Sequence, residues 1–456
     1  MNERPCIPVT AVILVVAAVA AAQAPAPQLT LRDAAEMALA HAPEVAAARA
    51  AADESAASAR LAGDASHPQV WLTSALGWAR GLPMAVGGSV PAALAVSCRT
   101  TLYDRSSRIE SLQREAASSD AAGRGERARL DVLREVLVAY ARCWADDALV
   151  AAGRERQRAR TAMLERAQER QAAGRSTEFD VEQARLTLAR ARLHALDLDT
   201  DREFDRLDLS RLTGVPPDRL SFPARDPLAA LPELPDGDTV EAAQAADPEL
   251  RASARSIKLL DEAAGMATGG AAPVIQAEAQ YARLSRMNEF DSYYSRFQIN
   301  DWSVGVVVAL PLWGGGRGPD LAARTAAGLA RRQNERRTRA DALAIKVQRA
   351  AWNAERARAA TQLGREAVAA AEEGVRLARA RAAEGRGDED AVDTRAIALA
   401  EAREEMARTL LARFVARVER LALCGDLENE VLGPARSTPG GEGLAARAPS
   451  DTRLMR

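Results

Sequence analysis

The pattern of apolar and polar positions divides the chain into helical and strand-like stretches. Stretches rich in Ala and Leu, with apolar residues at a helical period, alternate with two windows, 68–103 and 273–313, that carry Pro, Gly and turn residues. In the second window Ile275 and Ala277 alternate with Gln276 and Glu278, a period of two that is typical of a strand with one apolar face. The predicted helices cover residues 31–61, 104–172, 177–212, 238–267, 319–383 and 388–424.

This order of elements occurs twice. The segment that begins at Asp33 and contains Pro43-Glu44 returns at Asp238 with Pro248-Glu249, and later matches keep the same order at offsets of roughly 205 to 211 residues. Several matches in one order indicate an internal duplication. We therefore expect one repeat at 29–214, a Pro-rich linker at 215–237, a second repeat at 238–424 and a disordered tail at 433–456.

The helix lengths are coupled within each repeat. The two shorter helices together are about as long as the single long one, which at 1.5 Å per residue would reach roughly 100 Å. Two short helices placed end to end would match one long partner along its length. This predicts a helical shaft with strands at one end and turns at Gly174 and Gly385 at the other.

The N-terminus predicts export. Arg4 precedes an apolar run from Ile7 to Ala22, and small residues follow it. These features are typical of a secretory signal peptide, here residues 1–24, with cleavage near Ala22 or Ala24. The alternative is a membrane anchor, but the run is short for a span of about 20 residues.

The strand windows predict a membrane β-structure. Aromatic residues are only 4% of the chain, and most of them fall in these two windows, as expected for interfacial girdles. A soluble sheet with an aromatic core is the alternative. Four strands cannot close a pore by themselves, so the membrane hypothesis requires several chains to share one barrel. The girdle candidates are Trp71, Trp78, Tyr103, Tyr281, Trp302 and Trp313.

Composition argues against several other classes. The net charge of −2 gives no support for a nucleic-acid partner, and three His and four Cys argue against a metal cluster. The glycines from Gly314 to Gly318 lack the Lys-Ser/Thr of a phosphate-binding loop. No nucleophile–base pattern stands out. We expect no enzyme activity, no cofactor and no metal.

The sequence resembles the TolC-type outer-membrane efflux (outer-membrane factor) family. The resemblance covers about Leu29 to Cys424. It rests on the segments Pro43-Glu44, Leu310–Arg317, Arg170–Val181 and Arg381–Val392.

The resemblance implies a mainly α-helical protein with a membrane β part. Each protomer of a homotrimer would give four strands to a shared twelve-stranded barrel in outer-membrane lipid, and the helices would form a periplasmic tunnel. Such proteins are passive exit ducts of tripartite efflux systems. A periplasmic adaptor would join the duct to an inner-membrane transporter of the resistance-nodulation-division (RND) or ABC type. The loops Gly81–Gly88 and Ser285–Asp301 would lie outside the cell.

The helix turns carry the candidate gate and docking residues. The family's gate positions hold Ala391 and Thr394 here, each one place after an Asp, and Arg175 and Arg386 stand where the family usually has Leu. Rings of carboxylates at a tunnel mouth would select cations. The alternative is that these acids only favour the positive end of the return helix. The gate candidates are Asp180, Asp388, Asp390 and Asp393. The candidate adaptor contacts are Arg170, Gly174, Arg175, Arg381, Gly385 and Arg386, with a solvated helix end as the alternative.

Two other functions stay open at this stage. A duct of a type I protein secretion system would have the same architecture, so the cargo can be a small molecule, a metal ion or a polypeptide. A periplasmic coiled-coil structural protein without transport activity would place the strand windows in a soluble domain.

Overall fold

The computed structural model describes residues 28–64, 66–74, 92–223, 231, 240–284, 300–311 and 317–433. The expected signal peptide, the tail, the loop Gly81–Gly88 and most of the loop Ser285–Asp301 lie outside the described residues, as do Trp78 and Trp313.

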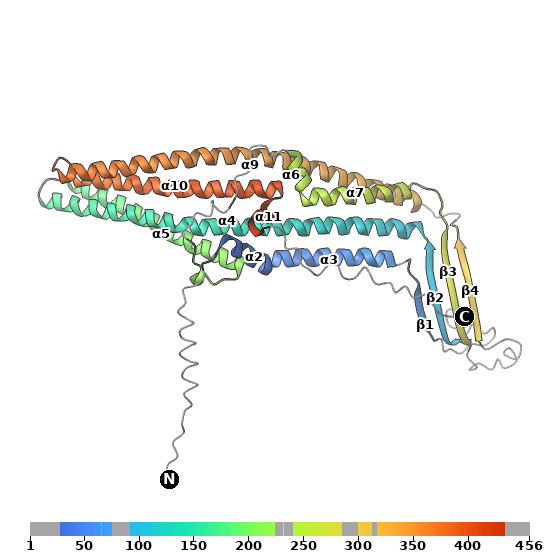
Figure 1. Cartoon of the computed structure of the whole chain (residues 1–456). Helices are drawn as coiled ribbons and strands as arrows, with labels where there is room; N and C mark the ends of the chain where they lie inside the picture. Colours follow the sequence, from blue (N-terminus) through green and yellow to red (C-terminus); the bar gives the residue numbers. More distant parts are fainter. Residues whose placement is uncertain are drawn as a thin grey trace, which may run out of the picture. The chain divides into compact units, whose positions relative to one another are not determined.

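Helices and strands follow the predicted order (Figure 1). The helices of the first repeat are α2 (Leu31–His41), α3 (Pro43–Asp64), α4 (Arg105–Ala172) and α5 (Glu178–Thr213), followed by a short 3₁₀ helix η1 (Pro217–Arg219). Those of the second repeat are α6 (Val240–Ala246), α7 (Pro248–Ala267), α9 (Arg317–Ala383) and α10 (Glu389–Cys424), followed by α11 (Leu427–Leu432). The strands are β1 (Gln69–Thr73), β2 (Ala92–Tyr103), β3 (Val274–Leu284) and β4 (Asn300–Ala309). None of the described helices is long and apolar enough to cross a membrane.

The chain divides into two compact units that do not coincide with the two repeats. Unit 1 comprises residues 1–42, 130–239 and 347–456, and unit 2 comprises residues 43–129 and 240–346. Each unit takes part of each repeat because α4 and α9 both pass from one unit into the other. Packing therefore occurs between the repeats, as expected when neither repeat can bury its apolar face alone.

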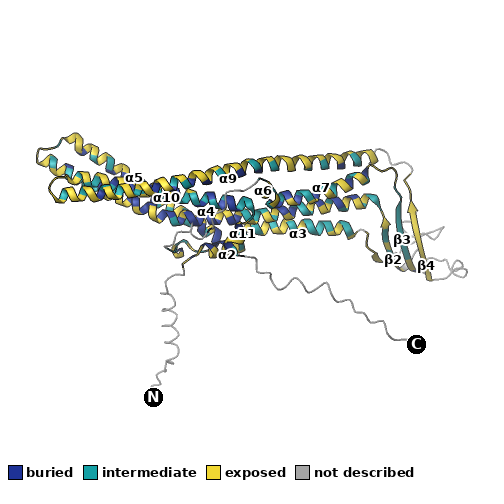
Figure 2. Ribbon diagram, turned by 45° about the horizontal axis from the view of Figure 1, so that its top comes forward, coloured by how far each residue is buried: buried dark blue, intermediate teal, exposed yellow. Residues whose placement is uncertain are grey.

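Unit 1 is a helical bundle that carries both helix turns. Its largest fully buried side chains include Tyr140, Leu137, Phe414 and Val418. The Tyr140 hydroxyl donates to the carbonyl of Leu29 at 3.0 Å, which fixes the start of the described chain against α4. Figure 2, which colours the ribbon by burial, shows buried residues interspersed with exposed ones along these helices.

Unit 2 contains the sheet and the helices that lead to it. Ile109 and Leu112 of α4 pack on Ala263 and Ala267 of α7. Gly123 allows the same two helices to approach closely, because a Cβ atom there would lie 2.5 Å from the Cβ of Ala252. Small residues thus allow close helix packing, as their frequency in the sequence suggests.

Two predicted helices are each two helices in the structure. The stretch 31–61 breaks at Ala42, which is extended (φ −63°, ψ 117°) before Pro43, and the stretch 238–267 breaks at Asp247 before Pro248. Proline disfavours a helical conformation in the residue before it and is well placed at the first turn of a new helix. Both breaks therefore follow from the duplicated Pro-Glu motif.

Candidate functional site

The sheet has four antiparallel strands in the order β1-β2-β3-β4, so β1 and β4 are its edges. Residues paired directly across antiparallel strands point to the same face. In one cross-strand row Leu72 pairs with Val96, Val96 with Tyr281, and Tyr281 with Trp302. The register continues this apolar face through Val70, Cys98, Ala279 and Val304, then Thr100, Ala277 and Val306, then Ile275 and Val308.

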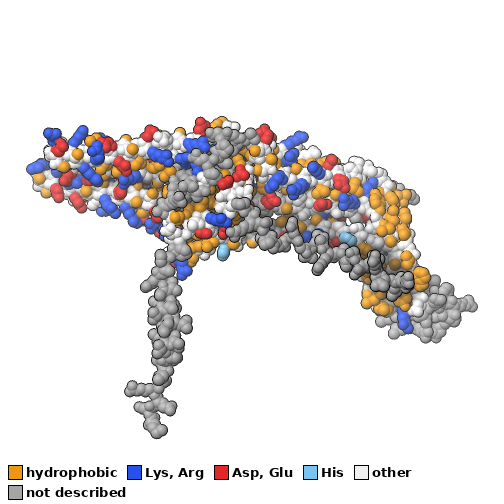
Figure 3. Space-filling model, viewed as in Figure 1, with side chains coloured by type: hydrophobic (Ala, Val, Ile, Leu, Met, Phe, Trp, Pro, Cys, Tyr) orange, Lys and Arg blue, Asp and Glu red, His pale blue; other side chains and the backbone are white. Residues whose placement is uncertain are grey.

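The opposite face of the sheet is mainly polar, and it also carries the apolar Trp71, Ala95, Ala282 and Val307. Here Arg99 pairs with Glu278, with 3.0 Å between Nη2 and Oε1. The same face carries Gln69, Ser97, Thr101, Gln276, Gln280 and Ser303. All residues of β4 are exposed in the single chain, and Figure 3 shows hydrophobic side chains gathered over the sheet. A sheet with one apolar and one polar face has the pattern required of a wall between lipid and water.

Three of the girdle candidates lie on the apolar face. Tyr281 and Trp302 are paired near one end, and Tyr103, opposite Ile275, lies near the other. Trp71 differs, since it pairs with Ser97 on the polar face. The expected girdle role of Trp71 is therefore not supported by the register.

The two helix turns of unit 1 have the same backbone geometry. Gly174 and Gly385 adopt positive φ of 71° and 67°. In the first turn the amides of Gly174 and Arg175 donate to the carbonyls of Gln171 and Arg170, and the second turn repeats both bonds from Gly385 and Arg386. This pair of bonds is the Schellman motif, which requires a left-handed residue and so favours glycine.

Two of the four gate candidates cap the return helices. Asp180 forms a capping box with Thr177, whose backbone N–H and hydroxyl donate to its Oδ2 at 2.9 and 2.7 Å. These bonds, with one from Ser176, lower the pKa of Asp180 below its usual value. Asp388 is the N-cap of α10 and accepts from the Asp390 amide at 3.3 Å. The alternative of a helix-terminal role therefore has direct geometric support for these two residues.

The other two gate candidates form a cluster with arginines of α4. Arg166 binds Asp390 with 2.8 Å between Nε and Oδ1, and its Nη2 atom binds Asp393. Arg170 binds the second oxygen of Asp390 at 2.6 Å. We call Arg166, Arg170, Asp390 and Asp393 the tip cluster.

The tip cluster is partly shielded from water, with 19–23% of the side chain exposed for Arg166, Asp390 and Asp393. Partial burial opposes the charged form of Asp390, but the hydrogen bonds from Arg166 and Arg170 outweigh it and lower the pKa of the carboxyl. The same bonds outweigh burial at Arg166 and raise the pKa of its guanidinium. Asp390 and Arg166 are therefore ionised at neutral pH.

The docking candidates fall into two groups. Arg170 takes part in the tip cluster, whereas Arg175, Arg381 and Arg386 are exposed at the turns. Arg386 contacts Glu384 of its own turn at 3.4 Å. Exposed arginines at a helix turn are available to a partner.

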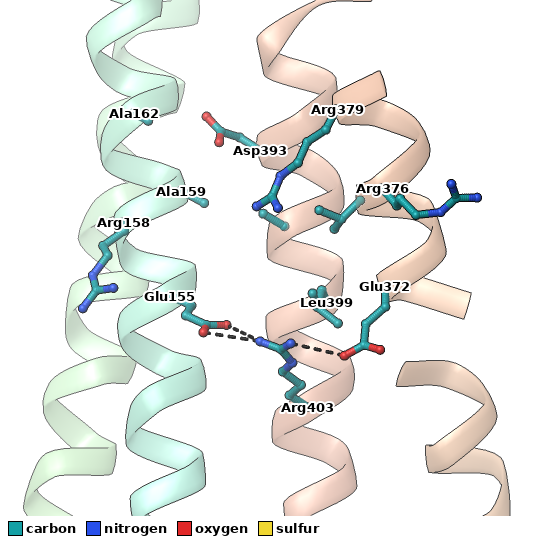
Figure 4. A pocket seen from close by; sticks show the side chains of 12 residues that line it. Glu155, Arg158, Ala159, Ala162, Glu372, Arg376, Arg379, Asp393, Leu399 and Arg403 are labelled. Carbon is teal, nitrogen blue, oxygen red and sulfur yellow. Dashed lines mark hydrogen bonds and ion pairs between the residues drawn. The ribbon is translucent and has the colours of Figure 1, made fainter. Parts of the chain in front are cut away.

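A cleft of about 740 Å³ lies next to the tip cluster, between α4, α9 and α10 (Figure 4). Arg403 reaches across it from α10 and binds Glu155 of α4 at 3.1 Å and Glu372 of α9 at 3.2 Å. Asp393 lines the cleft at its other end. The two helix hairpins, α4–α5 and α9–α10, are thus joined by ion pairs at several levels along their length, which also include Arg134–Glu419 and His194–Glu404.

Sequence reasoning missed Arg166 and Arg403. Neither belongs to a motif, and their partners lie more than 200 residues away in the sequence for the α4–α10 pairs. Within the described part of the chain no group of three or more His, Cys, Asp or Glu side chains could hold a metal ion. Cys98, Cys143 and Cys424 form no disulfide within the described part of the chain.

Comparison with protein families relates this geometry to known proteins. The model of the outer membrane efflux protein family matches residues 34–215, which is nearly the whole first repeat. The predicted family resemblance is confirmed. Comparison with curated proteins finds no significant match.

Solved structures show that this efflux-protein fold extends over both repeats. The outer membrane protein VceC of Vibrio cholerae has a TM-score of 0.69 at 17% identity, covering 87% of this chain and 96% of its own. The Campylobacter jejuni CmeC outer membrane channel has a TM-score of 0.69 at 13% identity, covering 87% and 86%. The open-state MtrE outer membrane channel of Neisseria gonorrhoeae has a TM-score of 0.68 at 17% identity, covering 87% and 89%. The predicted fold class, mainly α with a small β part, is thus confirmed.

Proposed function

We propose that this chain is the outer-membrane channel of a tripartite efflux system. Three copies would form one passive exit duct from the periplasm to the exterior for small molecules or metal ions. A periplasmic adaptor and an inner-membrane transporter of the RND or ABC type would supply cargo and energy. The observation that carries this proposal is the two-faced sheet with open edges, supported by the family match over the first repeat.

The sheet supports shared assembly. Its edges, β1 and β4, have backbone groups that no other described strand pairs, and these groups must be satisfied inside a membrane. Pairing β4 of one protomer with β1 of the next satisfies them. Three such sheets give twelve strands, enough to enclose a water-filled lumen lined by the polar face.

An apolar face on α5 supports the same assembly in unit 1. Phe179, Leu186, Leu193 and Leu207 are spaced by multiples of seven residues and are 52–73% exposed. A heptad spacing of apolar residues is typical of a helix that packs against another helix. In the proposed trimer this face would be covered by a neighbouring protomer.

We propose that the tip cluster controls the periplasmic opening. Its ion pairs tie α4 to α10 and so restrain the two hairpins at the turns. A partner that loosens these pairs would let the hairpins separate. The freed Asp390 and Asp393 would then present carboxylates to the opening and favour passage of cations.

Exposed Arg175, Arg381 and Arg386 are our candidates for adaptor contact. They lie on equivalent turns of the two repeats, so a trimer would present six similar turns to a ring of adaptors. Cysteine crosslinking from Arg175 or Arg386 to a co-expressed adaptor tests this assignment. Absence of crosslinks at both turns would contradict it.

Membrane fractionation combined with single-channel recording tests the function. We expect the mature chain in outer-membrane fractions, released only by detergent, and we expect conductance from the purified protein in planar bilayers. A water-soluble periplasmic product without conductance would instead support the structural coiled-coil alternative. A neighbouring gene for an ABC exporter beside a secreted toxin would favour polypeptide cargo over small molecules or metal ions.

A further inference from the structure

One tryptophan of the sheet stands on its polar face. Trp71 of β1 pairs with Ser97, and the same cross-strand row continues through Gln280 to Ser303. Trp302, by contrast, lies on the apolar face of β4. In the proposed barrel the polar face lines the lumen, so the Trp71 indole faces water rather than lipid. An aromatic ring among a few polar groups is typical of a surface that binds a small molecule.

The neighbours of Trp71 leave its ring accessible. Ser97 lies directly opposite, and Ala95 is the next residue of β2 on the same face; both side chains are short. The long side chain on the other diagonal, Arg99, binds Glu278 of β3 with 3.0 Å between Nη2 and Oε1. Trp71 is accordingly 57% exposed in the single chain.

The charges on the polar face favour a cation. Within the described strands this face carries Arg99, Glu278 and Asp301, which is one positive charge against two negative ones. In the proposed barrel β4 of one protomer lies beside β1 of the next, so a strand with Asp301 adjoins each Trp71. The face of an indole also attracts cations, because its π electrons carry a partial negative charge.

We propose that the three Trp71 side chains of the trimer form an aromatic contact site in the barrel lumen that binds cations with a planar aromatic ring. This inference rests on the proposed function and names a class of cargo for the duct. Cyclic symmetry places equivalent residues at one height around the axis, so the three indoles form a ring. Stacking on the indole and attraction of the positive charge act together on such a ligand.

Fluorescence in lipid vesicles tests the position of Trp71. Bromine atoms on the acyl chains quench tryptophans that contact lipid. We expect Trp302→Leu to lower the quenched fraction of the emission of the full chain, because it removes an emitter in contact with lipid. Trp71→Leu should raise that fraction, because it removes an emitter that faces water. A quenched fraction that falls or stays unchanged in Trp71→Leu would overturn the lumenal position.

Block of the ion current in planar bilayers tests the binding. Ethidium is a planar aromatic cation, and tetrabutylammonium is a cation without an aromatic ring. We expect Trp71→Leu to weaken the ethidium block about fivefold, Trp71→Phe to retain most of it, and Trp302→Leu to match the unmodified channel. Block by tetrabutylammonium should be the same in all four channels. An ethidium block that is unchanged in Trp71→Leu, or an equal loss of block for both cations, would overturn the aromatic site.

Failure of this inference is distinct from failure of the proposed function. An unmodified chain that inserts but does not conduct would contradict the exit duct, and the fluorescence result would still decide where Trp71 lies. A conducting channel with the same ethidium block in every variant would contradict the aromatic site alone.

Discussion

Arg166 of α4 and Asp390 of α10 bind each other with 2.8 Å between Nε and Oδ1, and this ion pair joins the two helix hairpins. Each hairpin comes from a different repeat, so this contact forms between the two repeats and within neither of them. Its position beside both helix turns makes it the natural restraint on separation of the hairpins.

Removal of the restraint should open the channel. We predict that Arg166→Gln raises the mean conductance of purified channels several-fold, because it releases Asp393 and leaves Asp390 bound to Arg170 alone. It should also lower the free energy of unfolding by roughly 1–3 kcal/mol, since partly buried carboxylates lose their partner. Arg124→Gln replaces an exposed arginine of the same helix outside the cleft; it is the control and should change neither quantity. Unchanged conductance in Arg166→Gln would show that the tip cluster is not a gate.

The stability that the tip cluster contributes should depend on pH only in the acid range. The pKa of Asp390 is lowered, so its contribution to stability is present above the unfolded value near 4 and is lost as pH falls further. We therefore predict that the melting temperatures of the unmodified chain and Asp390→Asn differ by a constant amount from pH 5 to 8 and converge below about pH 4. If the difference in melting temperature changed between pH 6 and pH 8, the group that titrates would not be Asp390.

The turn glycines should not tolerate a side chain. Gly174→Ala and Gly385→Ala each place a Cβ atom on a left-handed residue, which costs about 1–2 kcal/mol. Gly374→Ala, in the helical part of α9, is the comparison. Its added Cβ would meet only ordinary contacts, so it should stabilise by roughly 0.5–1 kcal/mol. Chemical denaturation of the three variants measures these values, and equal effects at all three sites would contradict the turn geometry.

Neighbouring residues of β4 should respond in opposite ways to a charge. Val304 lies on the apolar face and Ser303 on the polar face. We predict that Val304→Arg destabilises the membrane-inserted form by about 2–4 kcal/mol, because the charge would face lipid, whereas Ser303→Arg is tolerated. Heat-modifiability on gels after refolding into lipid vesicles reports insertion. Equal tolerance at the two positions would mean that the apolar face does not contact lipid.

The apolar face of α5 should be needed for assembly. Leu193→Asp places a charge in the centre of the heptad stripe and should reduce the fraction of assembled protein on size exclusion. Asp197→Asn, on the same helix, should leave that fraction unchanged. Normal assembly of Leu193→Asp would mean that this face of α5 stays exposed to solvent in the assembled protein.

Local sequence patterns predicted most of the helices and strands. They did not predict the contacts between residues that are far apart in the sequence. Alternation at Ile275–Tyr281 indicated a strand with one apolar face, and the register shows that all four strands share that face. The repeat indicated both turns, because the left-handed backbone conformation at each turn favours glycine, and Gly174 and Gly385 stand at matching positions. Pro43 is a signal for a helix break at Ala42. The helical period continues on both sides of it, so the sequence pattern predicted one helix in place of two.

The candidate site was only partly predictable. The acids at the turns were visible as a cluster, but nothing in the sequence separated Asp180 and Asp388, which cap helices, from Asp390 and Asp393, which bind arginines of α4. Arg166 is one of many arginines in the chain, and only the fold brings it to α10. Trp71 lies on the polar face, because it is one position away from Val70 and Leu72 and successive side chains of a strand alternate between the two faces.

The mass of the native particle tests the central claim most directly. Native mass spectrometry of the mature chain, released gently from detergent, should give three copies in one particle, and the same preparation should conduct ions in planar bilayers. A monomer, a dimer or a larger ring as the stable form of a properly inserted protein would contradict the shared barrel.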